Sequence, residues 1–353
     1  MATTEQVEGG AVEGVAADRV SSWFASHVEG AEPPLQFELI AGGRSNLTYR
    51  VTDAAGHVYA LRRPPLHHVL PTAHDMGREY RVIAALGPTP VPVPHTLGLC
   101  LDEAVNDRPF YVMEFVEGHI LRDKATAERA LDERGRRRAG ESVADTLAAL
   151  HAVDVDAVGL GDFAKRDGYI ERQLRRWREQ FANSQVPGSE AAAIVATVHD
   201  RLAGDIPPQS ASTIVHGDYR LDNTVLGPDG SVRAVLGWEI CTLGDPLADV
   251  GMLMVYWAEP GDQAATLGLT PTIVDGFPSR AEMRARYEKA SGRDLSRLDF
   301  YVAFGYWKLA CIVQGVYARY VGGAAAGDRS SIDGWAESVV QLAEAAQAAL
   351  DAG

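Results

Sequence analysis

The sequence predicts an α+β protein in which a small, sheet-rich part precedes a larger, mainly helical part. Short runs of β-branched and aromatic residues, separated by glycine-containing turns, dominate the first third of the chain. After Glu117 and Gly118, apolar residues recur at the three- and four-residue spacing of amphipathic helices. We therefore expect a disordered tail at 1–16, a sheet-rich lobe at 17–115 and a helical lobe at 116–353.

The composition is that of a globular protein and excludes some classes of partner. The chain has 353 residues, of which 46% are hydrophobic and 23% are charged, and its formal net charge is -15. Nucleic acids and anionic membranes bind clustered positive charge, so neither is an expected partner. Three widely spaced cysteines indicate no disulfide framework, and no apolar run approaches the roughly 18 residues that span a bilayer. A cytoplasmic location is expected.

Local patterns define the elements of the sheet-rich lobe. Residues 1–16 are mostly small and lack a large anchoring side chain, whereas Asp18 begins a pattern with Val20, Trp23 and Phe24 on one helical face. Beyond it, alternating residues and turn signals predict an antiparallel meander, then a helix and a further strand. These segments are Phe37–Ile40, Leu47–Thr52, His57–Leu61, the helix Gly77–Leu86 and the strand Phe110–Phe115.

Helical periodicity dominates the rest of the chain and is interrupted once. A centre of loops and strands is expected at 213–250. The predicted helices are 124–152, 168–182, 189–203, 279–291, 297–320 and 332–350.

The segment His216–Asn223 carries the most informative chemistry. It contains His216, Asp218 and, five residues after the aspartate, Asn223. Phosphoryl transfer requires a carboxylate that orients and deprotonates the attacking hydroxyl, and an oxygen ligand for a magnesium ion. Asp218 and Asn223 supply both on one loop. The alternative is a polar loop between strands in which aspartate and asparagine only form turns.

The run from His216 to Leu226, followed by Gly244 to Asp249, resembles the aminoglycoside phosphotransferase family. It is most similar to the subgroup that also occurs as a kinase-like module joined to acyl-CoA dehydrogenases. The resemblance implies the two-lobed, protein-kinase-like fold that this family shares with choline kinases, with ATP and Mg²⁺ as cofactors. It also implies that Asp218 is the catalytic base, that His216 braces the loop, and that Asn223 binds magnesium.

Candidate nucleotide-binding residues lie in the sheet-rich lobe. Gly42, Gly43, Ser45 and Asn46 form a turn between two strand patterns, where free backbone N–H groups can cover phosphates. A hairpin turn without a ligand uses the same glycines. The family resemblance favours the nucleotide-covering loop.

Four further residues match the family's nucleotide site. Arg62 occupies the position of the phosphate-binding cation, which is a lysine in most distant relatives. Glu79 occupies the position of the helix carboxylate that pairs with this cation. Glu114 and Val116 match the linker whose backbone holds adenine. Solvated arginines on a surface strand and an ordinary strand end are the alternatives.

Gly237 departs from the family pattern, which places the principal magnesium-ligating aspartate at this position. Three explanations are open. In the first, Glu239 lies two residues on, hence on the same strand face, and its longer side chain reaches the metal. Alternatively, the protein binds a nucleotide or another ligand without efficient catalysis. Thirdly, the glycine is an introduced substitution at an otherwise competent site.

These observations lead to one functional hypothesis and two rivals. The first is an ATP-dependent O-phosphotransferase, a kinase that acts on the hydroxyl of a small molecule. The alternatives are a regulatory pseudokinase and a partner of an acyl-CoA dehydrogenase. The scaffold handles aminoglycosides, macrolides, choline-like alcohols, sugars and hydroxyacyl compounds, so the resemblance does not choose the acceptor.

Overall fold

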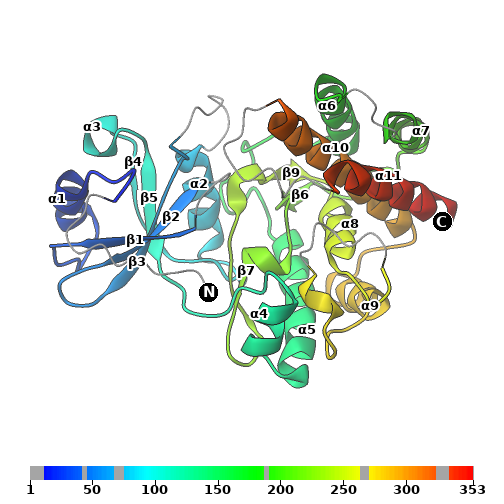
Figure 1. Ribbon diagram of the computed structural model, residues 1–353. Coiled ribbons are helices and arrows are strands. Elements are labelled where there is room, and N and C mark those ends of the chain that lie inside the picture. The colour runs from blue at the N-terminus through cyan, green and yellow to red at the C-terminus, as the bar shows by residue number, and fades with distance from the viewer. Residues whose placement is uncertain are drawn as a thin grey trace. The chain divides into compact units, whose positions relative to one another are not determined.

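The computed structural model describes residues 12–41, 46–66, 75–186, 191–262, 270–322 and 334–352. The chain forms two compact units, Met1–Glu117 and Gly118–Gly353. The first contains a five-stranded sheet, and helices dominate the second (Figure 1). The predicted α+β class is thus confirmed, and the division between the units falls two residues after the predicted one.

The sheet of the first unit is antiparallel throughout, in the order β1-β2-β3-β5-β4. The predicted meander corresponds to its first three strands. The strand β4 was missed because its residues are only partly buried and carry no clear alternation. The elements are α1 (Ala17–His27), β1 (Gln36–Ala41), β2 (Leu47–Thr52), β3 (Val58–Arg63), α2 (Met76–Leu86), β4 (Thr96–Cys100), α3 (Glu103–Asn106) and β5 (Phe110–Glu114).

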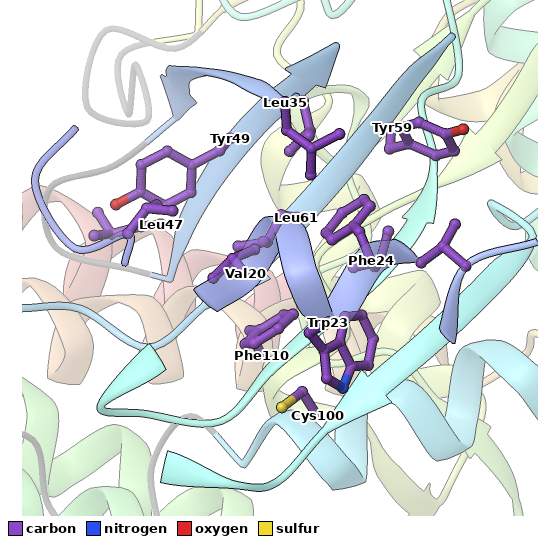
Figure 2. Close-up of a cluster of buried hydrophobic side chains, with 14 residues drawn as sticks. Val20, Trp23, Phe24, Leu35, Leu47, Tyr49, Tyr59, Leu61, Cys100 and Phe110 are labelled. Atoms are coloured by element: carbon purple, nitrogen blue, oxygen red, sulfur yellow. The ribbon is translucent and has the colours of Figure 1, made fainter. Parts of the chain in front are cut away.

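The core of this unit lies between α1 and one face of the sheet (Figure 2). Trp23 and Phe24 project from α1, as their helical spacing predicted. The Trp23 ring meets the Phe110 ring edge to face, with centroids 4.9 Å apart. Gly98 on β4 allows this contact, because a Cβ atom there would lie 2.8 Å from the Trp23 ring.

The predicted tail at 1–16 was wrong in its last part. Residues 1–11 lie outside the described residues, but residues 12–16 pack on the first unit through their backbone. The Tyr49 hydroxyl donates to the Glu13 carbonyl (2.7 Å), and the Ala16 N–H donates to the Asn106 Oδ1 (2.8 Å). The Val15 side chain is also buried in the core of this unit, with Val12 packed against it, so this segment is held by apolar packing as well as by hydrogen bonds.

The second unit contains the predicted helices and one unexpected break. The pattern at 124–152 forms two helices, because Asp132 caps the second one by accepting a hydrogen bond from the Gly135 N–H (2.7 Å). The helices are α4 (Lys124–Ala130), α5 (Glu133–His151), α6 (Tyr169–Asn183), α7 (Ala191–Gly204), α8 (Leu247–Tyr256), α9 (Arg280–Ser291), α10 (Leu298–Val321) and α11 (Trp335–Ala352).

Short strands form the centre of the second unit, in the predicted 213–250 region. Strand β6 (Thr213–Val215) pairs with β9 (Thr242–Gly244), and β7 (Thr224–Leu226) pairs with β8 (Val232–Val235). Helix α10 packs against both α8 and α11, and α10 and α11 lie side by side in Figure 1. Within the described ranges, no helix combines the length and the apolar character needed to cross a bilayer.

Truncation of Phe24 tests the packing of α1 on the sheet. Phe24 is fully buried, so Phe24→Ala leaves a cavity and should lower the free energy of unfolding by about 3–5 kcal/mol. Urea unfolding followed by circular dichroism measures this change. Leu101→Ala is the control, since Leu101 is 62% exposed and its truncation should cost less than about 0.5 kcal/mol. Equal losses in both variants would contradict this description of the core.

Candidate active site

In the first unit, Arg62 and Glu79 form the predicted ion pair. The Arg62 Nε donates to the Glu79 Oε2 at 3.1 Å. Arg62 lies opposite Thr48 in the β2–β3 register and also donates to its Oγ1 (3.0 Å). Glu79 is 2% exposed and accepts a further hydrogen bond from the Tyr111 hydroxyl (3.1 Å). The guanidinium is therefore held in place by two neighbouring side chains.

Only one member of the predicted phosphate-covering loop lies within the described residues. Gly42, Gly43 and Ser45 fall outside them. Asn46 is buried, and its side-chain amide donates to Glu79. The start of β2 is thus tied to the same carboxylate that holds Arg62.

The predicted adenine-binding residues lie at and beyond the end of β5. Glu114 is the last residue of that strand, and its side chain is exposed. The Glu114 N–H donates to the His95 carbonyl (2.8 Å), so this group is already used within the unit. Val116 is half-buried beyond the strand end.

In the second unit, the loop between β6 and β7 brings Asp218 and Asn223 together. The Asn223 side-chain amide donates to the Asp218 carbonyl oxygen (2.8 Å) and to its Oδ2 (2.9 Å). Arg220 lies on the other side, with its Nε 3.4 Å from the Asp218 Oδ1. The Asp218 carboxylate is half-buried and has a fixed orientation between these two side chains.

His216 braces the loop from inside. It is fully buried, and its Nε2 lies 2.8 Å from the Leu236 carbonyl oxygen. The Asp218 N–H donates to the His216 Nδ1 (3.3 Å), so a neutral ring with its proton on Nε2 satisfies both contacts. The histidine links the catalytic loop to the end of β8.

Asp249, on α8, anchors the same loop from the opposite direction. Its carboxylate accepts the N–H groups of His216 (2.6 Å) and Gly217 (2.8 Å). His151 on α5 is the third partner, with its Nε2 3.3 Å from the Asp249 Oδ2. Burial alone would raise the pKa of Asp249, but hydrogen bonding and attraction from His151, followed by His216 and Gly217, lower it overall.

Asp245 has a structural role in the turn before α8. Its Oδ1 accepts the Leu247 N–H (3.1 Å), and its Oδ2 accepts the Tyr301 hydroxyl (2.7 Å). Burial raises the pKa of Asp245, against the effect of these hydrogen bonds.

Gly237, where the resemblance led us to expect an aspartate, has a left-handed backbone with φ +80° and ψ 44°. A Cβ atom here would lie 2.8 Å from the Asn223 Oδ1. Residue 237 and the Asn223 amide oxygen are therefore direct neighbours. A side chain at 237 would require the whole Asn223 side chain to shift, because the Asn223 Cγ would also lie 2.8 Å from the added Cβ atom.

Glu239 does not lie on a strand. Strand β8 ends at Val235, and Glu239 belongs to the short 3-10 helix Trp238–Ile240. The predicted alternation from residue 237 therefore does not apply, and that argument for Glu239 was wrong. In the described part of the chain, no three side chains of histidine, cysteine, aspartate or glutamate gather as a metal cluster.

Two cations beside the loop were missed by sequence reasoning. Arg220 follows Asp218 by two residues, and its guanidinium lies over the Tyr256 ring, 5.0 Å from the centroid. Lys308 is buried in the middle of α10, and its Nζ donates to the Gly217 carbonyl (3.0 Å). Position two residues after the base marks Arg220 as a candidate, whereas no local signal distinguishes Lys308 from an ordinary helical lysine.

A narrow cavity of about 20 Å³ opens next to the catalytic loop within the second unit. Its walls combine aromatic and aliphatic groups with two guanidinium groups and one carboxylate. The lining residues include Arg122, Arg220, Asp222, Leu253, Tyr256 and Trp257.

Comparison with known proteins places this arrangement in a family. A family model described as "Phosphotransferase enzyme family" matches residues 36–301. The chain belongs to this phosphotransferase family.

Two similar proteins share about a third of its residues. A candidate aminoglycoside phosphotransferase from Ralstonia eutropha, solved by crystallography, is 34% identical and has a TM-score of 0.76, with 94% of this chain and 98% of that one covered. Acyl-CoA dehydrogenase family member 10 of Mus musculus is 34% identical over 91% of this chain. The chain spans only 30% of that relative's length.

The fold extends to more distant kinases. A choline kinase from Cryptosporidium parvum has a TM-score of 0.65 at 12% identity, with 95% of this chain and 97% of that one covered. At this identity the similarity shows the fold alone.

Replacement of Asp249 tests the anchoring of the loop. In the parent protein, the N–H groups of His216 and Gly217 donate to the Asp249 carboxylate, whereas Asp249→Asn offers them a neutral amide. We therefore expect the free energy of unfolding to fall by about 3 kcal/mol. Chemical denaturation measures the change. Asp167→Asn, at an exposed aspartate, is the matched control and should change stability by less than about 0.5 kcal/mol. An Asp249→Asn protein as stable as its parent would show that the buried carboxylate does not hold the loop.

Proposed function

We propose that this protein is an ATP-dependent O-phosphotransferase that acts on the hydroxyl of a small molecule. The observation that carries the proposal is the fixed Asp218 carboxylate, held by the Asn223 amide on a loop anchored to Asp249. Phosphoryl transfer depends mainly on positioning and charge stabilisation, so a rigid carboxylate next to the acceptor is the central requirement.

Asp218 is proposed as the base that accepts the proton of the attacking hydroxyl. His216 acts indirectly, because it is buried and contacts the Asp218 backbone rather than solvent. Arg220 is close enough to Asp218 to orient the same carboxylate.

The first unit is proposed to bind the nucleotide. Arg62 is the phosphate-binding cation, and its pairing with Glu79 supports this role because a guanidinium fixed by neighbours is pre-organised. Gly42, Gly43, Ser45 and Asn46 are proposed to cover the phosphates, and the backbone at Glu114 and Val116 to hold adenine.

The proposed magnesium site is weakened at Gly237. Magnesium in such sites is bound by one or two carboxylates in addition to substrate phosphates. Asn223 supplies an amide oxygen that faces residue 237, but the glycine supplies no carboxylate beside it. Glu239 stays a candidate ligand, and the present donor set alone does not make a conventional magnesium site.

The missing carboxylate at Gly237 supports a second candidate function. A pseudokinase that binds a nucleotide or metabolite for regulation requires the folded loop and the phosphate-binding pair, but not the missing carboxylate. Gly237 distinguishes the two functions, since an active enzyme must replace the lost charge.

For the acceptor, we propose a hydroxylated acyl thioester as the first class to test. Relatives over most of this chain are named acyl-CoA dehydrogenases, and a kinase and a dehydrogenase in one chain can share a substrate if its acyl group bears a hydroxyl. A polycationic aminoglycoside is less suitable, because the one carboxylate that lines the cavity next to the loop, Asp222, already pairs with Arg122 and Arg220.

The decisive experiment compares the parent protein with Gly237→Asp. We expect the aspartate to strengthen magnesium-dependent ATP binding and to raise turnover by about 10²-fold or more, because it restores a charge at the phosphates. Calorimetry measures binding, and release of ADP measures turnover, with hydroxyacyl-CoA, choline, a macrolide and an aminoglycoside as acceptors. A parent that already turns over ATP, with no gain in the variant, would indicate that another carboxylate binds the metal.

Asp218→Asn in the more active background is the control for chemistry. It should retain ATP binding and lose at least about 10²-fold in turnover, because an amide cannot accept the proton. Binding without turnover in every form would favour the pseudokinase. If no form binds a nucleotide, the phosphotransferase proposal fails.

A further inference from the structure

Lys308 is a buried charge that the proposed chemistry does not yet use. It lies on α10 (Leu298–Val321), and only 3% of its surface is exposed. Lysine is rarely buried to this extent, because removal of an ammonium group from water is costly. Burial accordingly lowers the pKa of Lys308, while the charges of Asp218 and Asp249 act in the opposite direction.

The partner of Lys308 is the backbone of the catalytic loop. Its Nζ donates to the Gly217 carbonyl (3.0 Å), and the N–H of the same glycine donates to the Asp249 Oδ1 (2.8 Å). Gly217 is therefore held on both sides by opposite charges, a carboxylate from α8 and an ammonium from α10. The ammonium contacts the negative carbonyl oxygen, and the carboxylate contacts the positive N–H group, so both contacts are charge-assisted hydrogen bonds.

Gly217 has a backbone conformation that makes such support effective. Its φ is +86°, a region that favours glycine, and an added Cβ atom would lie 3.0 Å from the Ile240 Cγ1. Glycine has wide conformational freedom, so its own covalent structure does not fix the direction of its carbonyl. The hydrogen bonds with Asp249 and Lys308 fix that direction instead.

The Gly217 carbonyl also restrains the backbone of Asp218. The Gly217 carbonyl and the Asp218 N–H belong to one planar peptide unit. That N–H reaches the His216 Nδ1 (3.3 Å), so rotation of the unit would break the contacts at both ends and loosen the backbone that carries the Asp218 side chain.

A second contact restrains the ammonium itself. The Nζ lies 5.9 Å from the centroid of the Trp177 ring on α6, within the range of a cation–π interaction. The cation is thus held between an aromatic ring and the loop.

We propose that Lys308 is a positioning residue for phosphoryl transfer, which orients the Gly217–Asp218 peptide so that the Asp218 carboxylate faces the acceptor hydroxyl. This inference rests on the proposed function for the role of Asp218. It assigns no contact with substrate or nucleotide to Lys308.

The test is Lys308→Met, which keeps the length and apolar stem of the side chain and removes the charge and the donor. We expect kcat to fall by about 10-fold to 10²-fold while the KM for ATP stays within twofold, because misplacement of the base affects the chemical step. Loss of the buried ammonium also removes its desolvation cost, so Tm should change by no more than about 4 °C. The control is Lys289→Met, at an exposed lysine of α9, which should alter none of these quantities.

Hydrogen–deuterium exchange supplies a readout that does not depend on activity. In Lys308→Met, the amides of 216–218 should exchange at least about tenfold faster, while those of helix α1 in the first unit stay unchanged. Lys308→Gln, which keeps a shorter N–H donor, should recover part of both kcat and protection. It also keeps the test informative if the methionine variant does not fold.

The outcomes separate the two proposals. Unchanged kcat and unchanged loop exchange in both Lys308 variants overturn the role of Lys308. Parallel losses in kcat, ATP affinity and Tm also overturn it, because they indicate general structural damage. If neither the parent nor Gly237→Asp transfers phosphate, the proposed function fails, and the exchange comparison alone then decides whether Lys308 holds the loop.

Discussion

The Asp249 carboxylate accepts the N–H groups of two consecutive residues, His216 and Gly217, and the order of the catalytic loop depends on this anchor. A loop between two three-residue strands has few ladder hydrogen bonds of its own. A carboxylate can accept several hydrogen bonds at once, so one buried side chain replaces the support that longer strands would give. His151 then stabilises the anion from α5, so the loop is linked to the two helices α8 and α5.

Both units use the same principle at their functional residues. Glu79 in the first unit and Asp249 in the second are buried carboxylates, and each collects several donors from separate elements. Buried charges contribute little to net stability unless their hydrogen bonds are complete. Their advantage is orientation, because several donors with fixed directions leave a carboxylate one position. Glu79 thereby fixes the orientation of the Arg62 guanidinium, and Asp249 fixes the loop that carries Asp218.

The sequence allowed prediction of features that depend on local patterns. The meander β1–β3, the helices α6 to α11 other than α8, and the pairing of Arg62 with Glu79 follow from periodicity, turn residues and a recognisable motif. The break between α4 and α5 was missed because the apolar periodicity continues across Asp132, and the cap decides the boundary. Lys308 was missed because its partner lies 91 residues away, and a lysine in an apolar helix has no local mark that separates a buried role from an exposed one. The strand-face argument for Glu239 failed because the chain leaves the strand at Val235.

The left-handed backbone at Gly237 limits which side chains this position can carry. Asparagine and aspartate are the residues other than glycine that occupy this conformation most readily. Aspartate is therefore among the side chains that the backbone at 237 tolerates best, although any side chain at this positive φ is strained. A carboxylate at 237 would also displace the Asn223 side chain, whose amide now donates to the Asp218 carbonyl and carboxylate. Glycine at this position therefore leaves undisturbed the contact between Asn223 and Asp218 that any larger residue would strain.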